Sequence, residues 1–160
     1  MNYFDLHCDT LSEMLKSSTP LLDGPTAVSL KKGEQLKSWC QCFAIWTHDS
    51  AKGEAAYANY KKQLALLNEQ AILNSDRMTL CKSRSDMEQA VAEGKCAAIL
   101  TVENGSVIVG DLSKIAELKK DGVKIFSFTW NGKNELGSGI GSNNSLSMVG
   151  RSAVVELNRA

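Results

Sequence analysis

Near the start of the chain, a histidine and an aspartate stand one residue apart in the segment Asp5-Leu6-His7-Cys8-Asp9. Residues i and i+2 of an extended strand lie on the same side, with Cα atoms about 6–7 Å apart. His7 and Asp9 can therefore converge on one cation, and an imidazole with a carboxylate suits zinc or a similar borderline metal better than calcium. Because His-x-Asp is short and common, a buried strand whose last aspartate caps the next helix is the alternative interpretation.

Other residues able to bind a metal or a ligand follow other predicted strands. The almost wholly apolar run from Cys96 to Val102 predicts a buried strand that ends at Glu103. In parallel β/α folds, ligands gather at the carboxyl ends of the strands. We therefore expect His7, Asp9 and Glu103 to form a partial metal site.

Two further pairs, His48/Asp49 and Trp130/Asn131, also follow predicted strands. His48 and Asp49 could join the metal site, although a histidine in a polar loop is more often simply solvated.

Strands and helices alternate in the elements that must position these residues. Apolar patterns predict strands near residues 3, 39, 97 and 123, with a further short extended piece at 78–81. Capping-box patterns at Thr10 and Ser85 predict helix starts, and Gly94 and Gly122 predict helix ends. Helices are expected near 10–15, 30–36, 53–74, 85–93, 112–120 and 148–160. The alternation predicts an α/β fold of parallel β/α units rather than a sandwich.

Composition limits the classes of partner. The 160 residues are 43% hydrophobic and carry 18 basic and 18 acidic side chains, so neither nucleic acid nor an anionic membrane is an obvious partner. No run approaches a membrane span, and a motif starting at residue 5 leaves no room for a leader, so we expect a cytoplasmic protein. The five cysteines include no Cys-x-x-Cys pair and favour reduced packing thiols over a Cys40/Cys42 metal site.

The segment 132–144 carries glycines at positions 132, 137, 139 and 141. These glycines lack the strand-turn-helix setting and the spacing of a dinucleotide fingerprint. We interpret the segment as a flexible loop, over a site.

Four ordered blocks of this sequence resemble the membrane (renal) dipeptidase family of zinc peptidases, peptidase family M19. The blocks are Asp5-Leu6-His7-Cys8-Asp9-Thr10-Leu11, the segment 98–105 (AILTVENG), the segment 128–137 (FTWNGKNELG) and the segment 150–159 (GRSAVVELNR). They span essentially the whole chain, which resembles the amino-terminal half of a bacterial member.

The resemblance implies a (β/α)8 TIM barrel of the metal-dependent hydrolase type with two zinc ions. His7 and Asp9 would bind the first zinc and Glu103 would bridge both. A hydroxide held between the metals would attack the peptide bond of a dipeptide substrate. On this basis, residues 1–160 form a single domain, the amino-terminal half of a longer zinc-dependent dipeptidase, and alone are weakly active or inactive.

Two departures from the family qualify this expectation. Trp130 stands where mammalian-type members place a histidine thought to orient the substrate carbonyl, so we assign Trp130 and Asn131 to the substrate pocket. The chain has two histidines only, so its own residues support at most one metal site. The resemblance implies that the family's second-metal histidines, its later aspartate and its arginine would lie beyond residue 160.

Four strands cannot close an eight-stranded barrel, and open sheet edges favour a homo-oligomer. The alternative to an enzyme is therefore a non-catalytic half-barrel module that oligomerises and binds one metal ion. A different metal hydrolase with a His-x-His motif is disfavoured by Asp9.

Overall fold

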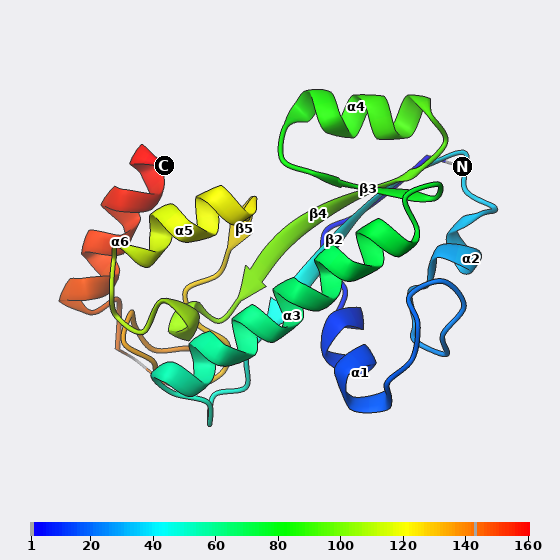
Figure 1. Cartoon of the computed structure of the whole chain (residues 1–160). Helices are drawn as coiled ribbons and strands as arrows, with labels where there is room; N and C mark the ends of the chain where they lie inside the picture. Colours follow the sequence, from blue (N-terminus) through cyan, green and yellow to red (C-terminus); the bar gives the residue numbers. More distant parts are fainter. Residues whose placement is uncertain (1, 143) are drawn as a thin grey trace. The chain divides into compact units, whose positions relative to one another are not determined.

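The computed structural model describes residues 2–142 and 144–160, so Asn143, in the predicted loop 132–144, lies outside the described residues. Its sheet has the order β1 (Asn2–Asp5), β2 (Ser38–Trp46), β4 (Cys96–Glu103) and β3 (Met78–Cys81), and β5 (Ile125–Phe126) also pairs with β4 (Figure 1). The pairings of β1 with β2 and of β3 with β4 are both parallel. The predicted parallel β/α units are therefore confirmed.

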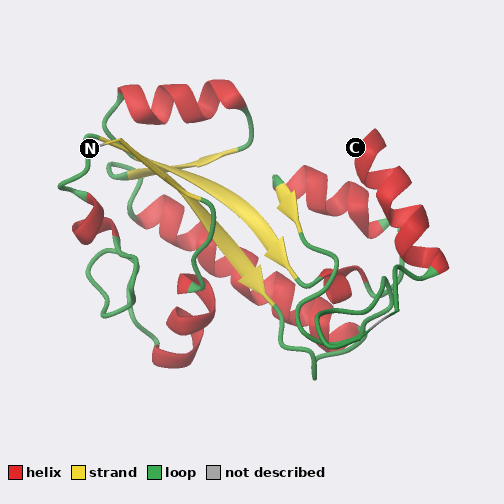
Figure 2. Ribbon diagram, turned by 180° about the vertical axis from the view of Figure 1, so that it is seen from behind, coloured by secondary structure: helices red, strands yellow, loops and turns green. Residues whose placement is uncertain are grey.

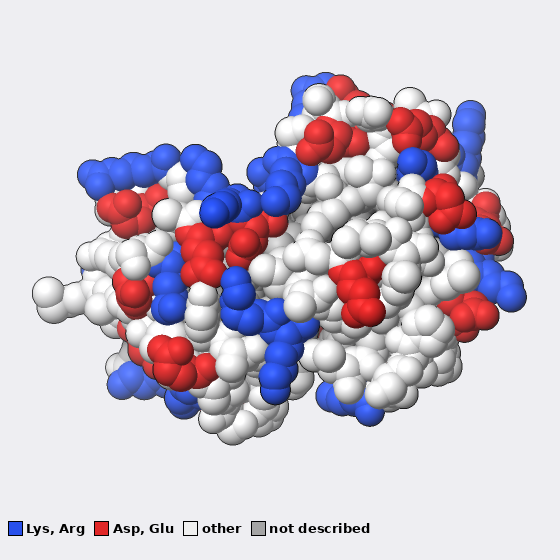
Figure 3. Space-filling model, in the orientation of Figure 1, with Lys and Arg blue, Asp and Glu red and all other residues white. Residues whose placement is uncertain are grey.

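Helices connect the strands (Figure 2). They are α1 (Thr10–Ser17), α2 (Leu30–Gly33), α3 (Glu54–Leu73), α4 (Arg84–Ala92), the 3₁₀ turn η1 (Gly105–Ile108), α5 (Lys114–Asp121) and α6 (Met148–Arg159). Among the described residues, no helix has the length and apolar character needed to cross a membrane. Basic and acidic side chains are interspersed on the face drawn in Figure 3, in keeping with the balanced composition.

The chain divides into two compact units, which we call unit 1 and unit 2. Unit 1 contains the residues up to Ile45 together with Gln63–Thr101, and unit 2 contains Trp46–Lys62 and Val102–Ala160. The expectation of a single domain stays a prediction.

Unit 1 contains most of β2 and β4, and the long apolar runs of these strands are buried on both sides. A buried cluster of Cys40, Cys81, Ala90 and Ala97 joins α4 to the sheet. All five cysteines are buried and free of disulfides, which agrees with the predicted packing thiols. Burial raises the pKa of the Cys42 and Cys81 thiols to about 11, so these thiols are neutral and poorly reactive at pH 7.

Unit 2 contains α5, α6 and the loop that leads into α6. Ser147 caps α6 by accepting a hydrogen bond from Gly150 N at 2.9 Å, and its own hydroxyl donates to Glu135 O at 2.6 Å. A side chain on Gly150 would meet the Leu136 carbonyl oxygen at 1.9 Å, so glycine lets this helix approach the loop closely.

Several local predictions need correction. Thr10 lies inside the first turn of α1, whose N-cap is Asp9. Ser83, not Ser85, caps α4. The strand expected over 123–129 is reduced to Ile125–Phe126, because the segment that follows turns into the loop network described below.

Candidate metal centre

His7 and Asp9 lie just beyond β1, in a segment still held to β2. Cys8 N donates to Cys42 O at 3.1 Å, and Ala44 N donates to Cys8 O at 3.1 Å. Because Cys8 faces the core, with 8% of its surface exposed, the alternation turns its two neighbours outward. His7 Nε2 then lies 3.3 Å from Asp9 Oδ1, with the two side chains 45% and 53% exposed. The two side chains thus lie on the same side and close together, while a shared cation stays a prediction.

The structure also bears on the alternative interpretation of Asp9 as a helix cap. Asp9 occupies the N-cap position of α1, yet its side chain makes no capping hydrogen bond there. Its carboxylate turns to His7 instead. The Asp5 carboxylate holds the segment that follows β1. It accepts hydrogen bonds from His7 N at 3.2 Å and from Gln41 Nε2 at 3.0 Å. The alternative role of Asp9 as a side-chain cap is therefore not seen, and metal binding by this pair stays a prediction.

Glu103 is the last residue of β4 and is half-buried. Its carbonyl accepts a hydrogen bond from Thr47 N at 3.2 Å, which holds the end of β4 to the residue that follows β2. Glu103 belongs to unit 2, whereas His7 and Asp9 belong to unit 1. A cation shared by the three residues therefore stays a prediction.

Asp49 has a structural role in unit 2. Its Oδ1 accepts from Asn104 Nδ2 at 3.2 Å, and its Oδ2 accepts from Gly132 N at 2.7 Å. Both carboxylate oxygens are thus used to fasten the loop after β5. The arrangement speaks against the earlier suggestion that Asp49 joins the metal site.

Asn104 and Asn134 are buried polar residues that sequence reasoning did not single out. Asn134 Nδ2 donates to Asn104 Oδ1 at 2.8 Å and to Phe128 O at 2.7 Å. Asn134 Oδ1 accepts from Leu136 N and Gly137 N, at 2.8 and 3.2 Å. The network shapes the loop that carries Trp130 and Asn131. The sequence offered one signal, the position of Asn104 directly after an apolar strand. That position alone does not identify the hydrogen-bond partners of Asn104.

Three aromatic rings meet in unit 2: Trp46 at the end of β2, His48 just after it, and Trp130 in the loop that follows β5. The Trp46 ring lies edge-on to that of Trp130, with centroids 5.1 Å apart. The His48 ring lies 5.7 Å from Trp46 and 5.6 Å from Trp130. Trp130 is half-buried, and Asn131 beside it is exposed. The predicted pocket residue Trp130 is therefore one wall of an aromatic cluster that includes His48.

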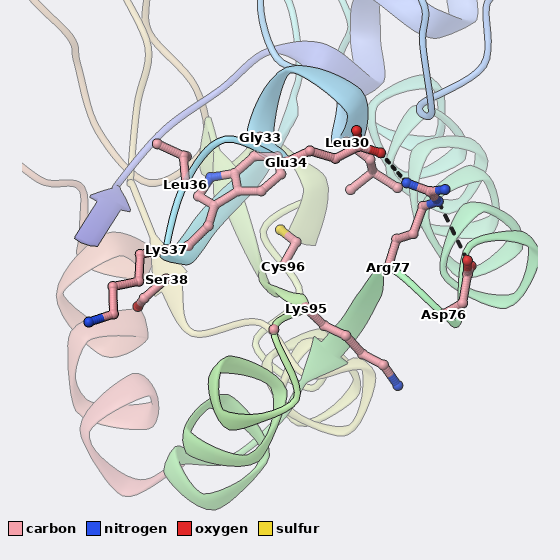
Figure 4. Close-up of a pocket in the computed structure, with 12 residues that line it drawn as sticks. Leu30, Gly33, Glu34, Leu36, Lys37, Ser38, Asp76, Arg77, Lys95 and Cys96 are labelled. Atoms are coloured by element: carbon pink, nitrogen blue, oxygen red, sulfur yellow. Dashed lines mark hydrogen bonds and ion pairs between the residues drawn. The ribbon is translucent and has the colours of Figure 1, made fainter. Parts of the chain in front are cut away.

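A cavity of about 350 Å³ lies elsewhere, in unit 1, and Figure 4 shows it. Its lining includes Ser38 and Trp39 at the start of β2 and Cys96 at the start of β4. Arg77 spans one side and pairs with Glu34 and Asp76. Ligands of parallel β/α folds gather at the carboxyl ends of the strands, whereas this cavity lies at the amino ends. We therefore assign it no part in the candidate site.

The model of the family "Membrane dipeptidase (Peptidase family M19)" matches residues 1–160. Among curated proteins, none matches this sequence.

Several solved structures share the fold. Dipeptidase AC, a metallopeptidase of family M19, has a TM-score of 0.88 and 21% identity over 99% of this chain and 54% of its own length. A metallopeptidase from Rhodobacter sphaeroides, solved with a phosphinate mimic of the dipeptide L-Ala-D-Ala, has a TM-score of 0.81 and 21% identity over 99% of this chain and 56% of its own. The probable dipeptidase PvdM from Pseudomonas aeruginosa has a TM-score of 0.70 and 23% identity over 86% of this chain and 39% of its own.

This chain thus spans between 39% and 56% of the length of these structures. The likeness confirms the predicted fold class, parallel β/α units that correspond to half of a (β/α)8 barrel. With the family model matched from residue 1 to residue 160, the chain belongs to the membrane dipeptidase family, peptidase family M19.

Proposed function

We propose that this chain is the amino-terminal, metal-binding half of a metallodipeptidase that hydrolyses dipeptides. The observation that carries the proposal is the family match over all 160 residues, taken with the approach of His7 Nε2 to Asp9 Oδ1. Since the matched structures are about twice as long as this chain, activity is proposed for a longer form of the protein, with this half alone weakly active or inactive.

The residues present fit a metal. His7, Asp9 and Glu103 each offer one ligand atom, and one imidazole with two carboxylates is a donor set that suits zinc. His7 and Asp9 would hold the first ion, and Glu103 would bridge to a second. When bound, the metal would lower the pKa of a coordinated water and polarise the carbonyl of the substrate.

The chain's own residues supply the remaining features of the site. The bond from Thr47 N to Glu103 O holds the bridging residue at the strand end. The Asp49 and Asn104 network positions the loop of Trp130 and Asn131, which we assign to the substrate pocket. The indole of Trp130 has no acceptor and a single donor, so it would form an apolar wall against the dipeptide.

Metal analysis tests the first part of the proposal. After incubation with zinc and removal of the excess, the chain should retain about one zinc. His7→Asn, Asp9→Asn and Glu103→Gln should each weaken zinc affinity by at least about tenfold, because losing a ligand costs more than losing an outer-shell partner. Asp111→Asn, which changes an exposed carboxylate of unit 2, is the control and should bind zinc as the original does. Equal zinc retention in all four variants would refute the assignment.

Dipeptide hydrolysis tests the second part. A longer form that spans the full length of the relatives should hydrolyse dipeptides when loaded with zinc. Asp9→Asn and Glu103→Gln should lower kcat/KM at least about a hundredfold, since metal catalysis supplies several kcal/mol of the barrier reduction. A longer form that holds zinc and cleaves no dipeptide would contradict the peptidase proposal.

One observation favours the alternative, a non-catalytic module that associates through its sheet edge. β1 is an edge strand, and its neighbourhood exposes Tyr3, Phe4 and Leu6 at 44%, 52% and 65%. Exposed edges of this kind invite pairing with another chain. Light scattering tests this alternative: a concentration-dependent dimer would support the association, and a monomer at all concentrations would exclude it.

We also propose that the protein is located in the cytoplasm. Its five cysteines are free of disulfides, as expected in a reducing compartment.

A further inference from the structure

His48 is exposed and follows β2 in unit 2, and its hydrogen bonds fix which ring nitrogen carries the proton. Ser50 N donates to His48 Nδ1 at 3.1 Å, and Ser50 Oγ lies 2.8 Å from the same nitrogen. A backbone N–H can only donate, so Nδ1 must be the acceptor. The tautomer assigned from these partners therefore places the ring proton on Nε2.

This tautomer leaves His48 as a directed donor. Within the described part of the chain, Nε2 makes no hydrogen bond, because both contacts of the ring nitrogens involve Nδ1. A zinc ion at Nε2 would need the proton on Nδ1, where it would face the N–H of Ser50. The arrangement suits donation to an oxygen atom and opposes metal binding.

The two tryptophans hold the ring that carries this donor. Trp46 meets it edge-on at an interplanar angle of 83°, and Trp130 lies tilted against it at 53°. Trp46 and Trp130 also contact each other at 84°. A donor whose ring packs against two others loses little conformational freedom on binding, and those rings offer apolar surface beside it.

We propose that His48 is a substrate-binding residue that donates a hydrogen bond from Nε2 to an oxygen of the dipeptide, beside the rings of Trp46 and Trp130. The proposal rests on the proposed function and adds a specificity element to it. The acceptor is either the peptide carbonyl or the terminal carboxylate, which share the chemistry of an sp² oxygen. A dipeptide with an apolar side chain would use both the donor and the aromatic rings.

A matched pair of substitutions separates the donor from the ring. His48→Phe keeps an aromatic ring against both tryptophans and removes the donor, whereas His48→Gln keeps an N–H donor and removes the ring. Calorimetric titration of the longer form without zinc, which should not cleave the ligand, with glycyl-leucine should give a Kd about three- to tenfold higher for His48→Phe and within about threefold of the original for His48→Gln. Asp111→Asn is the control and should leave the Kd unchanged.

The acceptor and the tautomer have their own measurements. Glycyl-leucinamide lacks the carboxylate. With this ligand, the difference in Kd between the original protein and His48→Phe should disappear if the carboxylate is the acceptor, and it should persist if the peptide carbonyl is the acceptor. The ¹⁵N chemical shifts of the imidazole should show an unprotonated Nδ1 and a protonated Nε2 without any ligand or metal.

The outcomes distinguish this inference from the proposed function. If the original protein binds glycyl-leucine and His48→Phe binds it with the same Kd as the original, the inference falls and the proposed function stands. A protonated Nδ1 would also overturn the inference alone. If the longer form of the original protein neither binds glycyl-leucine without zinc nor cleaves it with zinc, both fall.

Discussion

Asn104, the residue after β4, links three segments of unit 2 through its side chain. Its Nδ2 donates to Thr47 O and Asp49 Oδ1, and its Oδ1 accepts from Ser106 N and Asn134 Nδ2. The residue is 1% exposed. Asn104→Ala should lower the free energy of unfolding by about 2–4 kcal/mol, because buried partners lose their hydrogen bonds. Denaturant unfolding measures the change.

Asn104→Gly is the matched variant for this prediction. Asn104 has a backbone φ of +80°, which glycine adopts without strain and alanine does not. Both variants lose the same side-chain hydrogen bonds, so Asn104→Gly should be more stable than Asn104→Ala by about 1 kcal/mol. Equal stability of Asn104→Ala and the original protein would show that the network contributes nothing.

Single residues differ in how far the sequence predicts them. The pairing of His7 with Asp9 is predictable because it depends on strand alternation, a local property. The role of Asn104 depends on Thr47, Asp49 and Asn134, which lie 57, 55 and 30 positions away. No local pattern carries that information. The same holds for His48, whose ring meets Trp130 only in the folded chain.

At the scale of elements, the start of α4 is set by its N-cap residue, Ser83. Ser83 Oγ accepts from Asp86 N at 3.1 Å, and Asp86 Oδ2 accepts from Ser83 N at 2.9 Å. Ser83→Ala should destabilise the protein by about 1 kcal/mol, the usual value of an N-cap. Thermal and denaturant unfolding measure this loss.

Ser85 is the matched control for the cap of α4. It lies inside the helix and is exposed, so Ser85→Ala should change the free energy of unfolding by less than about 0.5 kcal/mol. A larger loss for Ser85→Ala than for Ser83→Ala would favour the sequence prediction over the structure. Both serines have an acidic residue three positions later, so the capping pattern alone could not choose between them.

At the scale of the whole molecule, Glu117 links global stability to pH. Its carboxylate accepts from Lys61 Nζ at 2.9 Å and from the Tyr57 hydroxyl at 2.7 Å. These bonds, that of Lys61 first, lower the pKa of Glu117 below its ordinary value of 4.5. A carboxyl group with a depressed folded-state pKa stabilises the fold above its unfolded pKa. This contribution is lost as the pH falls through the folded pKa.

Glu117→Gln should therefore lower the free energy of unfolding at pH 7, and the difference from the original should shrink as the pH falls below 4.5. The loss should be at most about 1 kcal/mol, because the pair is partly exposed and screened by solvent. Unfolding curves at several pH values measure it. Lys61→Met should lower the free energy of unfolding by a similar amount. Combining it with Glu117→Gln should cause little further loss, because both changes break the same ion pair. If the difference in unfolding free energy between Glu117→Gln and the original protein stayed constant from pH 7 to pH 3, the link between Glu117 and pH-dependent stability would be wrong.

The sequence by itself determined the parallel β/α alternation, the buried strands and the outward pairing of His7 with Asp9, since each follows from periodicity and short spacing. It also carried the motifs of the dipeptidase family. Only the tertiary structure decided which serine caps α4, that Asp49 fastens a loop, and that the His48 ring packs against two tryptophans. The physical reason is range: strand and helix patterns are set by neighbours along the chain. Buried hydrogen bonds and ring contacts depend on partners that folding brings together.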